Sequence, residues 1–196
     1  WYIRAKEVII SSGSIERPLV FGNNDTPGVI LSSAAKEYLK IYGVLVGKKP
    51  LVFTNNDSGY ETAIEFKKNG IDPLILDTRK DPNSEIINEA KSLNIDIKLS
   101  HVVVAAKGYK KVKSADIAKI SDDKKELSKI ENINCDCICV SGFWTPTIHL
   151  ASQSGNKTKF NEDIDAFIPG QSKQNETVLG SAKGIFTLEE TLKTSL

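Results

Sequence analysis

Three closely spaced cysteines are the first residues whose types and spacing could do chemistry. Cys135, Cys137 and Cys139 alternate with other residues in the run Cys-Asp-Cys-Ile-Cys-Val. In a strand, this period would place all three thiols on one face. Zinc ligands usually come from separated turns, often as C-x2-C pairs, and a disulfide reductase needs a redox C-x-x-C pair. We therefore expect buried thiols in a reducing compartment and no metal site.

The histidines offer little for acid–base catalysis. The sequence contains two, His101 in an expected strand and His149 shortly after Trp144-Thr145-Pro146. A catalytic triad needs a nucleophile within reach of its base, and no serine or cysteine motif in this chain supplies one. We expect no catalytic residue, and a packing or subunit-interface role for His149.

A polar turn after an apolar strand stands where a dinucleotide-binding unit carries glycines. It reads Thr54-Asn55-Asn56-Asp57-Ser58-Gly59. Early glycines would let backbone N–H groups approach a pyrophosphate at a helix N-terminus. Here Thr and Asn take those positions, and Asp57 would put a negative charge where a phosphate should sit, although aspartate is a good helix cap. Asp77 lies about 20 residues on, where a ribose-binding acid would be. Without the glycines, we interpret it as a turn residue.

Alternating strands and helices must position these residues. A strand over residues 50–53, a helix over 60–69 and a strand over 73–77 fit within about 30 residues and predict a βαβ unit with a parallel sheet. Apolar residues at helical spacing predict a helix over 32–42, which Gly43 ends. Further expectations are strands over 6–14, 95–97 and 137–140, a helix over 84–93, a hairpin over 101–120 broken at Lys107-Gly108, a solvated turn over 121–130, a polar stretch after residue 153 and a short helix over 187–193.

The composition is that of an ordinary globular chain. Of its residues, 40% are apolar and 26% charged, and the formal net charge of +1 favours neither nucleic acid nor an anionic membrane as a partner. The apolar runs are far shorter than the roughly 20 residues of a membrane span. We expect a soluble cytoplasmic protein. Because the sequence has no methionine and opens in strand-like residues at Trp1, we also expect it to be an internal piece of a longer chain.

The order of elements resembles the flavoprotein reductases that carry two dinucleotide-binding domains. A strand ending in Ser11-Ser12-Gly13 precedes a crossing segment, the βαβ unit, the hairpin and a strand ending in Ser141-Gly142. The resemblance implies an α/β fold in which a parallel-sheet, Rossmann-like FAD/NAD(P)-binding domain is inserted into a second, incomplete one. The inserted domain would be residues 48–133, and residues 1–47 and 134–196 would form the other. Residues 8–10 and 138–140 should then share a sheet.

Four stretches resemble, more closely, the alpha subunits of heterotetrameric sarcosine oxidases. They are Gly13-Ser14-Ile15-Glu16-Arg17-Pro18-Leu19-Val20-Phe21 with Asn24-Asp25-Thr26-Pro27-Gly28; Val52-Phe53-Thr54-Asn55-Asn56-Asp57-Ser58; Cys135-Asp136 with Val140-Ser141-Gly142-Phe143-Trp144-Thr145-Pro146 and His149-Leu150; and Leu179-Gly180-Ser181-Ala182-Lys183-Gly184-Ile185-Phe186-Thr187-Leu188. They occur in the order of that family and span nearly the whole chain.

This resemblance implies an oxidoreductase subunit that acts on the CH–NH group of donors, in a complex that converts sarcosine to glycine. It implies beta, gamma and delta partner subunits, FAD and FMN in the complex, NAD in the full-length alpha subunit, and folate in a domain outside this sequence. The family's NAD domain implies a cofactor-binding rim at two places. In the second of them, Gly180-Ser181-Ala182 replaces the Gly-Asp of the reductases. The rim residues are Ser12, Gly13, Ser14, Gly180, Ser181, Ala182 and Lys183. The chain alone should be inactive.

Two other functions remain open. The chain could belong to an alpha-type subunit of a related amine-oxidising complex, such as an opine oxidase, proline dehydrogenase or hydrogen cyanide synthase, because these share the nucleotide-domain architecture. It could also be an NADH-dependent flavin reductase. That function needs glycines in the second turn, where Thr54-Asn55-Asn56 stands instead.

Overall fold

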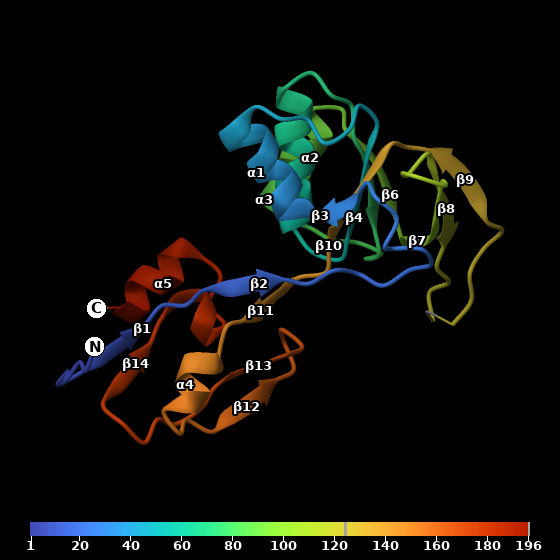
Figure 1. Cartoon of the computed structure of the whole chain (residues 1–196). Helices are drawn as coiled ribbons and strands as arrows, with labels where there is room; N and C mark the ends of the chain where they lie inside the picture. Colours follow the sequence, from blue (N-terminus) through green and yellow to red (C-terminus); the bar gives the residue numbers. More distant parts are fainter. Residues whose placement is uncertain (124, 196) are drawn as a thin grey trace. The chain divides into compact units, whose positions relative to one another are not determined.

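The computed structural model describes residues 1–123 and 125–195 and divides the chain into two compact units. Unit 1 combines the two ends of the chain, Trp1–Glu16 and Trp144–Leu196. Unit 2 is the continuous segment Arg17–Phe143 between them. The labels in Figure 1 follow the order of the elements along the chain.

Unit 2 is built on a five-stranded parallel sheet in the order β3-β10-β4-β5-β6. Every residue of the neighbouring inner strands β4 and β10 is buried. Burial on both faces of a parallel sheet explains why these strands are almost continuously apolar in sequence. The α/β fold with a central parallel sheet is therefore confirmed. The strands are β3 (Val29–Leu31), β4 (Pro50–Thr54), β5 (Leu74–Asp77), β6 (Asp96–Leu99) and β10 (Cys137–Ser141).

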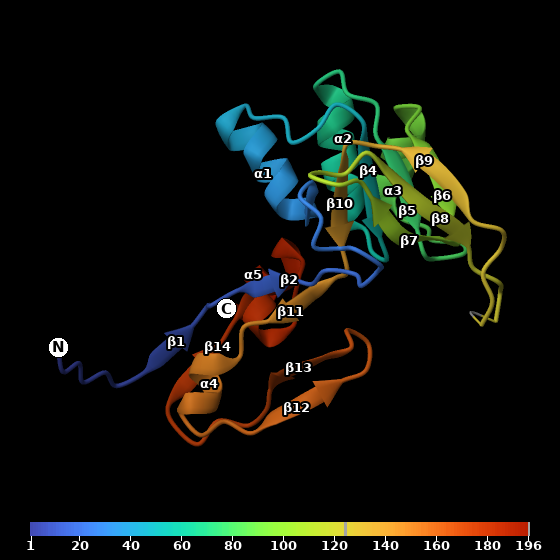
Figure 2. The same cartoon turned by 45° about the vertical axis from the view of Figure 1, so that its right-hand side comes forward.

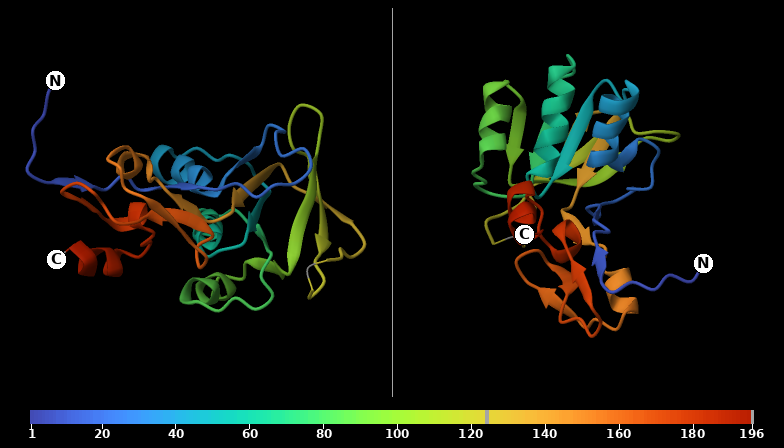
Figure 3. Two further views of the ribbon diagram at one scale, coloured as in Figure 1. Left: turned by 90° about the horizontal axis from the view of Figure 1, so that it is seen from below. Right: turned by 90° about the vertical axis from the view of Figure 1, so that its left-hand side faces the viewer.

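Helices cover one face of this sheet, and a small antiparallel sheet covers the other. The helices α1 (Ser32–Tyr42), α2 (Ser58–Lys68) and α3 (Glu85–Ser92) lie side by side in Figure 3. Strands β7 (His101–Lys107), β8 (Ser114–Lys119) and β9 (Glu131–Asn134) form the antiparallel sheet, which Figures 1 and 2 show on the opposite side. Each face has its own apolar core. Unit 2 is a three-layer domain, and its helix 32–42, βαβ unit and hairpin agree with the sequence predictions.

Unit 1 consists of three separate two-stranded sheets and short helices. One pair is parallel, β1 (Val8–Ile10) with β14 (Glu176–Val178). The other pairs are antiparallel: β2 (Ser14–Glu16) with β11 (Trp144–Pro146), and β12 (Thr158–Asn161) with β13 (Ala166–Pro169). The helices are α4 (His149–Gln153), the 3₁₀ helix η1 (Gly180–Lys183) and α5 (Leu188–Ser195).

The domain boundaries differ from those expected. Residues 17–47 and 134–143, which the sequence suggested for the first domain, lie in unit 2. The expected sheet shared by residues 8–10 and 138–140 is wrong, because β1 pairs with β14, whereas β10 lies between β3 and β4. The physical reason is burial, since only the middle of the central sheet covers both faces of the apolar strand β10.

The cysteines occupy two different cores. Cys137 and Cys139 face the helices, whereas Cys135 packs in the core of the opposite face. The expectation of one shared face is wrong for Cys135, because β10 begins only at Cys137 and the alternation of a strand does not reach back to it. All three cysteines are buried, and none forms a disulfide within the described residues. Burial raises the pKa of the Cys135 thiol to about 12.

Two polar segments contain strands that the sequence did not reveal. The hairpin β12–β13 lies in the expected polar stretch, and β9 follows the expected turn over 121–130. Lys124, within that turn, and Leu196, at the end of the expected first domain, lie outside the described residues.

Candidate functional site

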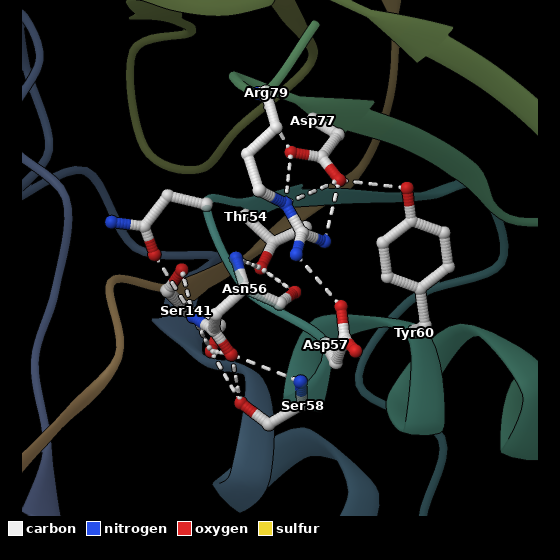
Figure 4. Close-up of polar contacts among 9 residues, drawn as sticks. Thr54, Asn56, Asp57, Ser58, Tyr60, Asp77, Arg79 and Ser141 are labelled. Atoms are coloured by element: carbon white, nitrogen blue, oxygen red, sulfur yellow. Dashed lines mark hydrogen bonds and ion pairs between the residues drawn. The ribbon is translucent and has the colours of Figure 1, made fainter. Parts of the chain in front are cut away.

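The order in which strands are added to the central sheet reverses between β4 and β10, and the carboxyl ends of these two strands mark the switch point. From β4 the chain moves outward through β5 to β6, and it later returns to place β10 on the other side of β4. In open α/β sheets, ligands bind in the crevice at such a switch point. The turn after β4 and Ser141 at the end of β10 both lie here, and Figure 4 shows their side chains together.

Gly59 keeps one of the three roles that glycine has in a dinucleotide turn. A Cβ at this position would lie only 2.6 Å from the Cβ and the Oγ1 of Thr54. The absence of a side chain therefore lets the start of α2 pack closely on β4, as the third glycine of a dinucleotide motif does.

Asn56 stands at the second glycine position, and its side chain is only 6% exposed. Its Nδ2 donates to the backbone oxygen of Ser141 at 3.1 Å and to its Oγ at 3.2 Å. Its Oδ1 accepts hydrogen bonds from the backbone N–H of Ser58 at 2.9 Å and from the Ser58 hydroxyl at 2.5 Å. The carboxamide thus connects the end of β10 to the start of α2 (Figure 4).

Asp77 ends β5 at the position of a ribose-binding acid, but its side chain is fully buried. The Tyr60 hydroxyl donates to its Oδ2 at 2.8 Å. The Nε of Arg79 lies 3.1 Å from both carboxylate oxygens, and Nη2 donates to Oδ2 at 2.8 Å. The remaining nitrogen, Nη1, donates to Asp57 at 2.8 Å. One guanidinium therefore serves two carboxylates (Figure 4).

These contacts fix the charges in the crevice. Burial works against the charge of Arg79, but its hydrogen bonds to Asp77 and then Asp57 raise its pKa above the ordinary value. Burial, followed by the hydrogen bond to Asp77, raises the pKa of Tyr60 far above that of a free tyrosine. Arg79 therefore stays charged and Tyr60 stays neutral. The cluster of Asp57, Tyr60, Asp77 and Arg79 is suited to connecting β5 with α2 and not to proton transfer.

The residues expected at the rim of a cofactor site lie in unit 1. The parallel strands β1 and β14 end at the same edge, where the N–H of Leu179 donates to Ile10 at 2.9 Å. A Cβ added to Gly13 would lie 3.9 Å from the Oγ of Ser181, so the two expected segments face one another. Gly13 and Gly180 have φ angles of +76° and +63°, a backbone conformation that glycine adopts without strain.

The other expected rim residues have different surroundings. The Ser12 hydroxyl donates to the backbone oxygen of Thr147 at 2.7 Å, and Ser14 begins β2. Lys183 is exposed, but Ala182 is fully buried in a small core with Ile10 and Val178. Ala182 therefore serves packing. A groove of about 490 Å³ beside β1 includes Ser11 and Ser12 in its lining.

Sequence reasoning missed the structural roles of Tyr60, Arg79 and Ser141. Tyr60 and Arg79 meet at Asp77, which lies 17 residues from Tyr60. Ser141 meets Asn56 from 85 residues away. The one local signal was Arg79, two residues after the acid at the end of β5. No cluster of metal-binding residues occurs in the described part of the chain, and no helix there is long and apolar enough to cross a membrane.

Comparison with known proteins agrees with the fold and with the resemblance stated from the sequence. The chain is 31% identical over 196 residues to the sarcosine oxidase subunit alpha of Corynebacterium sp. (strain P-1), a match that covers 99% of this chain and 20% of the relative. It is 34% identical over 184 residues to the subunit of the same name from Rhizobium meliloti (strain 1021), covering 93% and 17%. The chain resembles sarcosine oxidase subunit alpha over almost its whole length. The resemblance inferred from four stretches is confirmed.

The chain spans about a fifth of the length of these relatives. No family model matches it. Among solved structures, T. acidophilum thioredoxin reductase has a TM-score of 0.73 at 17% identity, covering 95% of this chain and 61% of that one. L-Proline dehydrogenase from P. horikoshii has a TM-score of 0.59 at 22% identity, covering 91% and 30%. At these identities the matches show the fold alone, which is Rossmann-like.

Proposed function

We propose that this chain is a nucleotide-binding and structural module of a sarcosine oxidase alpha subunit. The complex would remove the methyl group of sarcosine by oxidation and release glycine. The observation that carries this proposal is the 31% identity to a sarcosine oxidase subunit alpha along 99% of the chain. Because neither the described crevice of unit 2 nor the rim in unit 1 offers a free acid–base pair, the amine chemistry would take place in a partner subunit, and the chain alone would be inactive.

The cofactor of this module would be NAD, bound at the edge where β1 and β14 end. Gly13 and Gly180 support this site because each follows the end of its strand within a few residues and has a positive φ, which allows the backbone to approach an anionic group closely. Lys183 is the exposed cation of the same rim. Ser12, Ser14, Ser181 and the backbone of Ala182 complete the proposed set. When bound, NAD would supply hydride chemistry, and these residues would only hold and orient it.

The remaining parts of the proposal concern the assembly. FAD and FMN would lie elsewhere in the complex, together with beta, gamma and delta subunits and a folate-binding domain. The three cysteines are buried and form no disulfide within the described residues, which fits a reducing compartment, so we propose that the complex works in the cytoplasm.

The proposal is tested on the complete polypeptide that contains this sequence, purified with the subunits that accompany it. Oxidation of sarcosine, with about one NAD per alpha subunit, is expected. Lys183→Gln should weaken NAD binding about tenfold, as expected for loss of one charge-assisted contact. Lys173→Gln, at an exposed lysine of the same unit, is the matched control.

The same assay separates the alternatives. The complex could instead prefer L-proline or an opine as its substrate, or could oxidise glycine to hydrogen cyanide. Any of these results would assign the chain to a related amine-oxidising complex and contradict the first proposal. NADH-dependent reduction of free flavin by the 196-residue chain would instead make it a flavin reductase. A purified complex with no NAD would contradict the cofactor assignment alone.

A further inference from the structure

The crevice at the switch point of unit 2 has the framework of a dinucleotide site. It lies at the carboxyl ends of adjacent parallel strands, β4 and β10, and Gly59 lets α2 start close to β4. In such a framework the first backbone N–H groups of the helix are the donors that receive a pyrophosphate. What each donor and charge in this crevice already binds therefore decides whether a nucleotide can enter.

The first backbone N–H group of α2, that of Ser58, already donates a hydrogen bond within the chain. The N–H of Ser58 donates to the Oδ1 of Asn56 at 2.9 Å. The same carboxamide is anchored on its other side by the backbone oxygen and hydroxyl of Ser141. A side chain that is only 6% exposed, and whose oxygen and nitrogen both have partners, fills the space that a glycine would leave for a ligand.

The positive charge of the crevice is also used within the chain. The Asp57 carboxylate makes no capping hydrogen bond to α2 and accepts one from the Nη1 of Arg79 at 2.8 Å. The other donors of this guanidinium bind the buried Asp77. The side chains of Arg79 and Asp57 are 31% and 44% exposed, so this ion pair lies where an incoming anion would meet it.

We propose that unit 2 is a dinucleotide-type crevice closed by its own side chains. The Asn56 carboxamide stands in for the pyrophosphate at the helix start, and the Asp57 carboxylate stands in for a ligand phosphate on Arg79. The inference goes beyond the proposed function and does not depend on it, because it concerns a different unit. Unit 2 keeps the fold of a nucleotide domain as a scaffold, and two side chains determine that it takes no nucleotide.

The test is to remove both internal occupants and look for a gain of binding. The double variant Asn56→Gly/Asp57→Asn opens the space at α2 and frees one nitrogen of Arg79, while the fold is monitored by circular dichroism. The probes are ADP-ribose and inorganic pyrophosphate, titrated by calorimetry at fixed ionic strength. We expect affinity about tenfold or more above that of the wild type, because each restored contact is charge-assisted. The matched control, Asn94→Gly/Asp96→Asn, makes the same replacements at exposed positions before and at the start of β6, and should behave as the wild type.

The binding position distinguishes this proposal from the NAD site in unit 1. Added probe should shift the NMR signals of the Ser58 amide and the Arg79 side chain, and leave those of Gly13 and Gly180 unchanged. A folded double variant with no gain overturns the proposal, as does equal binding by the wild type at Ser58. If the double variant does not fold, Asp57→Asn alone is used, since Asp57 is partly exposed. Added pyrophosphate must then shift the NMR signals of the Arg79 side chain. If these signals do not move, the proposal is overturned.

Discussion

Replacing Arg79 by glutamine should destabilise unit 2 far more than its partly exposed position suggests. Asp77 is fully buried, and its charge is matched by three hydrogen bonds from the Arg79 side chain and one from Tyr60. Removing one partner of a buried ion pair leaves an uncompensated charge, which costs about 3–5 kcal/mol. Arg79→Gln leaves Asp77 only two neutral donors, the Tyr60 hydroxyl and the backbone N–H of residue 79, and no positive charge. We therefore expect a loss of about 3 kcal/mol at neutral pH.

Lys80→Gln is the matched control, next to Arg79 in the sequence. Lys80 pairs with Asp122 at 2.8 Å, but both side chains are more than 70% exposed, at 71% and 77%. Exposed pairs contribute about 0–1 kcal/mol, so the control should change stability very little. Both variants remove one positive charge, but only Arg79→Gln removes the charged partner of a buried carboxylate. The difference between them therefore measures the effect of burial.

Amide hydrogen exchange is the assay, because both tryptophans belong to unit 1 and their fluorescence would not report on unit 2. A loss of about 3 kcal/mol should increase the opening constant of the amides in β4 and β5 about a hundredfold. The double variant Asp77→Asn/Arg79→Gln should recover part of the loss, because it removes the buried charge together with its partner. Arg79→Gln exchange rates no faster than those of Lys80→Gln would refute the reasoning.

Three further predictions concern packing, titration and local stability. Gly59→Ala should cost about 1–3 kcal/mol in urea unfolding, because its Cβ would lie 2.6 Å from Thr54 and force a shift; an unchanged midpoint would show that α2 can move freely. Because the pKa of Tyr60 is raised by burial and by Asp77, stability should be complete below the ordinary tyrosine pKa of about 10 and fall as pH rises above it. Tyr60→Phe should remove that alkaline loss, and ultraviolet titration in which all five tyrosines ionise together would contradict it. Amides of β4 and β10 should exchange slowly and those of β1 rapidly, since the central strands are buried and two of the three β1 residues are exposed; equal protection in both units would contradict this order.

Local patterns predicted the local elements of this fold. Helical periodicity over residues 32–42 matched α1, and the apolar-turn-helix-apolar order of residues 50–77 matched β4, α2 and β5. The hairpin β12–β13 was missed because its apolar residues are scattered through a polar stretch. Two of them form the edge-to-face pair Phe160–Phe167, with ring centroids 5.3 Å apart. Strand β9 was missed because its residues are mostly polar and its partner β8 lies across a long connection.

The domain boundary and the polar network could not be predicted for a different reason. Both depend on contacts between residues far apart in sequence. The pairing of β10 with β3 places residues 29–31 in the central sheet, although their own sequence does not specify which sheet they join. The sequence of the turn showed directly that its glycines were replaced. The position of the Asn56 side chain could not be predicted, because it depends on a hydrogen bond to Ser141, which lies 85 residues away.

The two carboxyl edges of this chain differ in what they leave free, and this difference supports a division of roles. In unit 2, the edge carries Asn56 where backbone should approach a ligand, and the side chain there is buried and fully bonded. In unit 1, the corresponding edge carries Gly13 and Gly180, with the nearest atom to an added Cβ no closer than 3.9 Å and 3.5 Å. A glycine edge admits an anionic ligand at the backbone, and a side-chain-filled edge excludes it. If unit 2 were the nucleotide site, the glycines should stand in the turn after β4. Because they stand in unit 1 instead, we propose that ligand binding and structural support belong to different units of one chain.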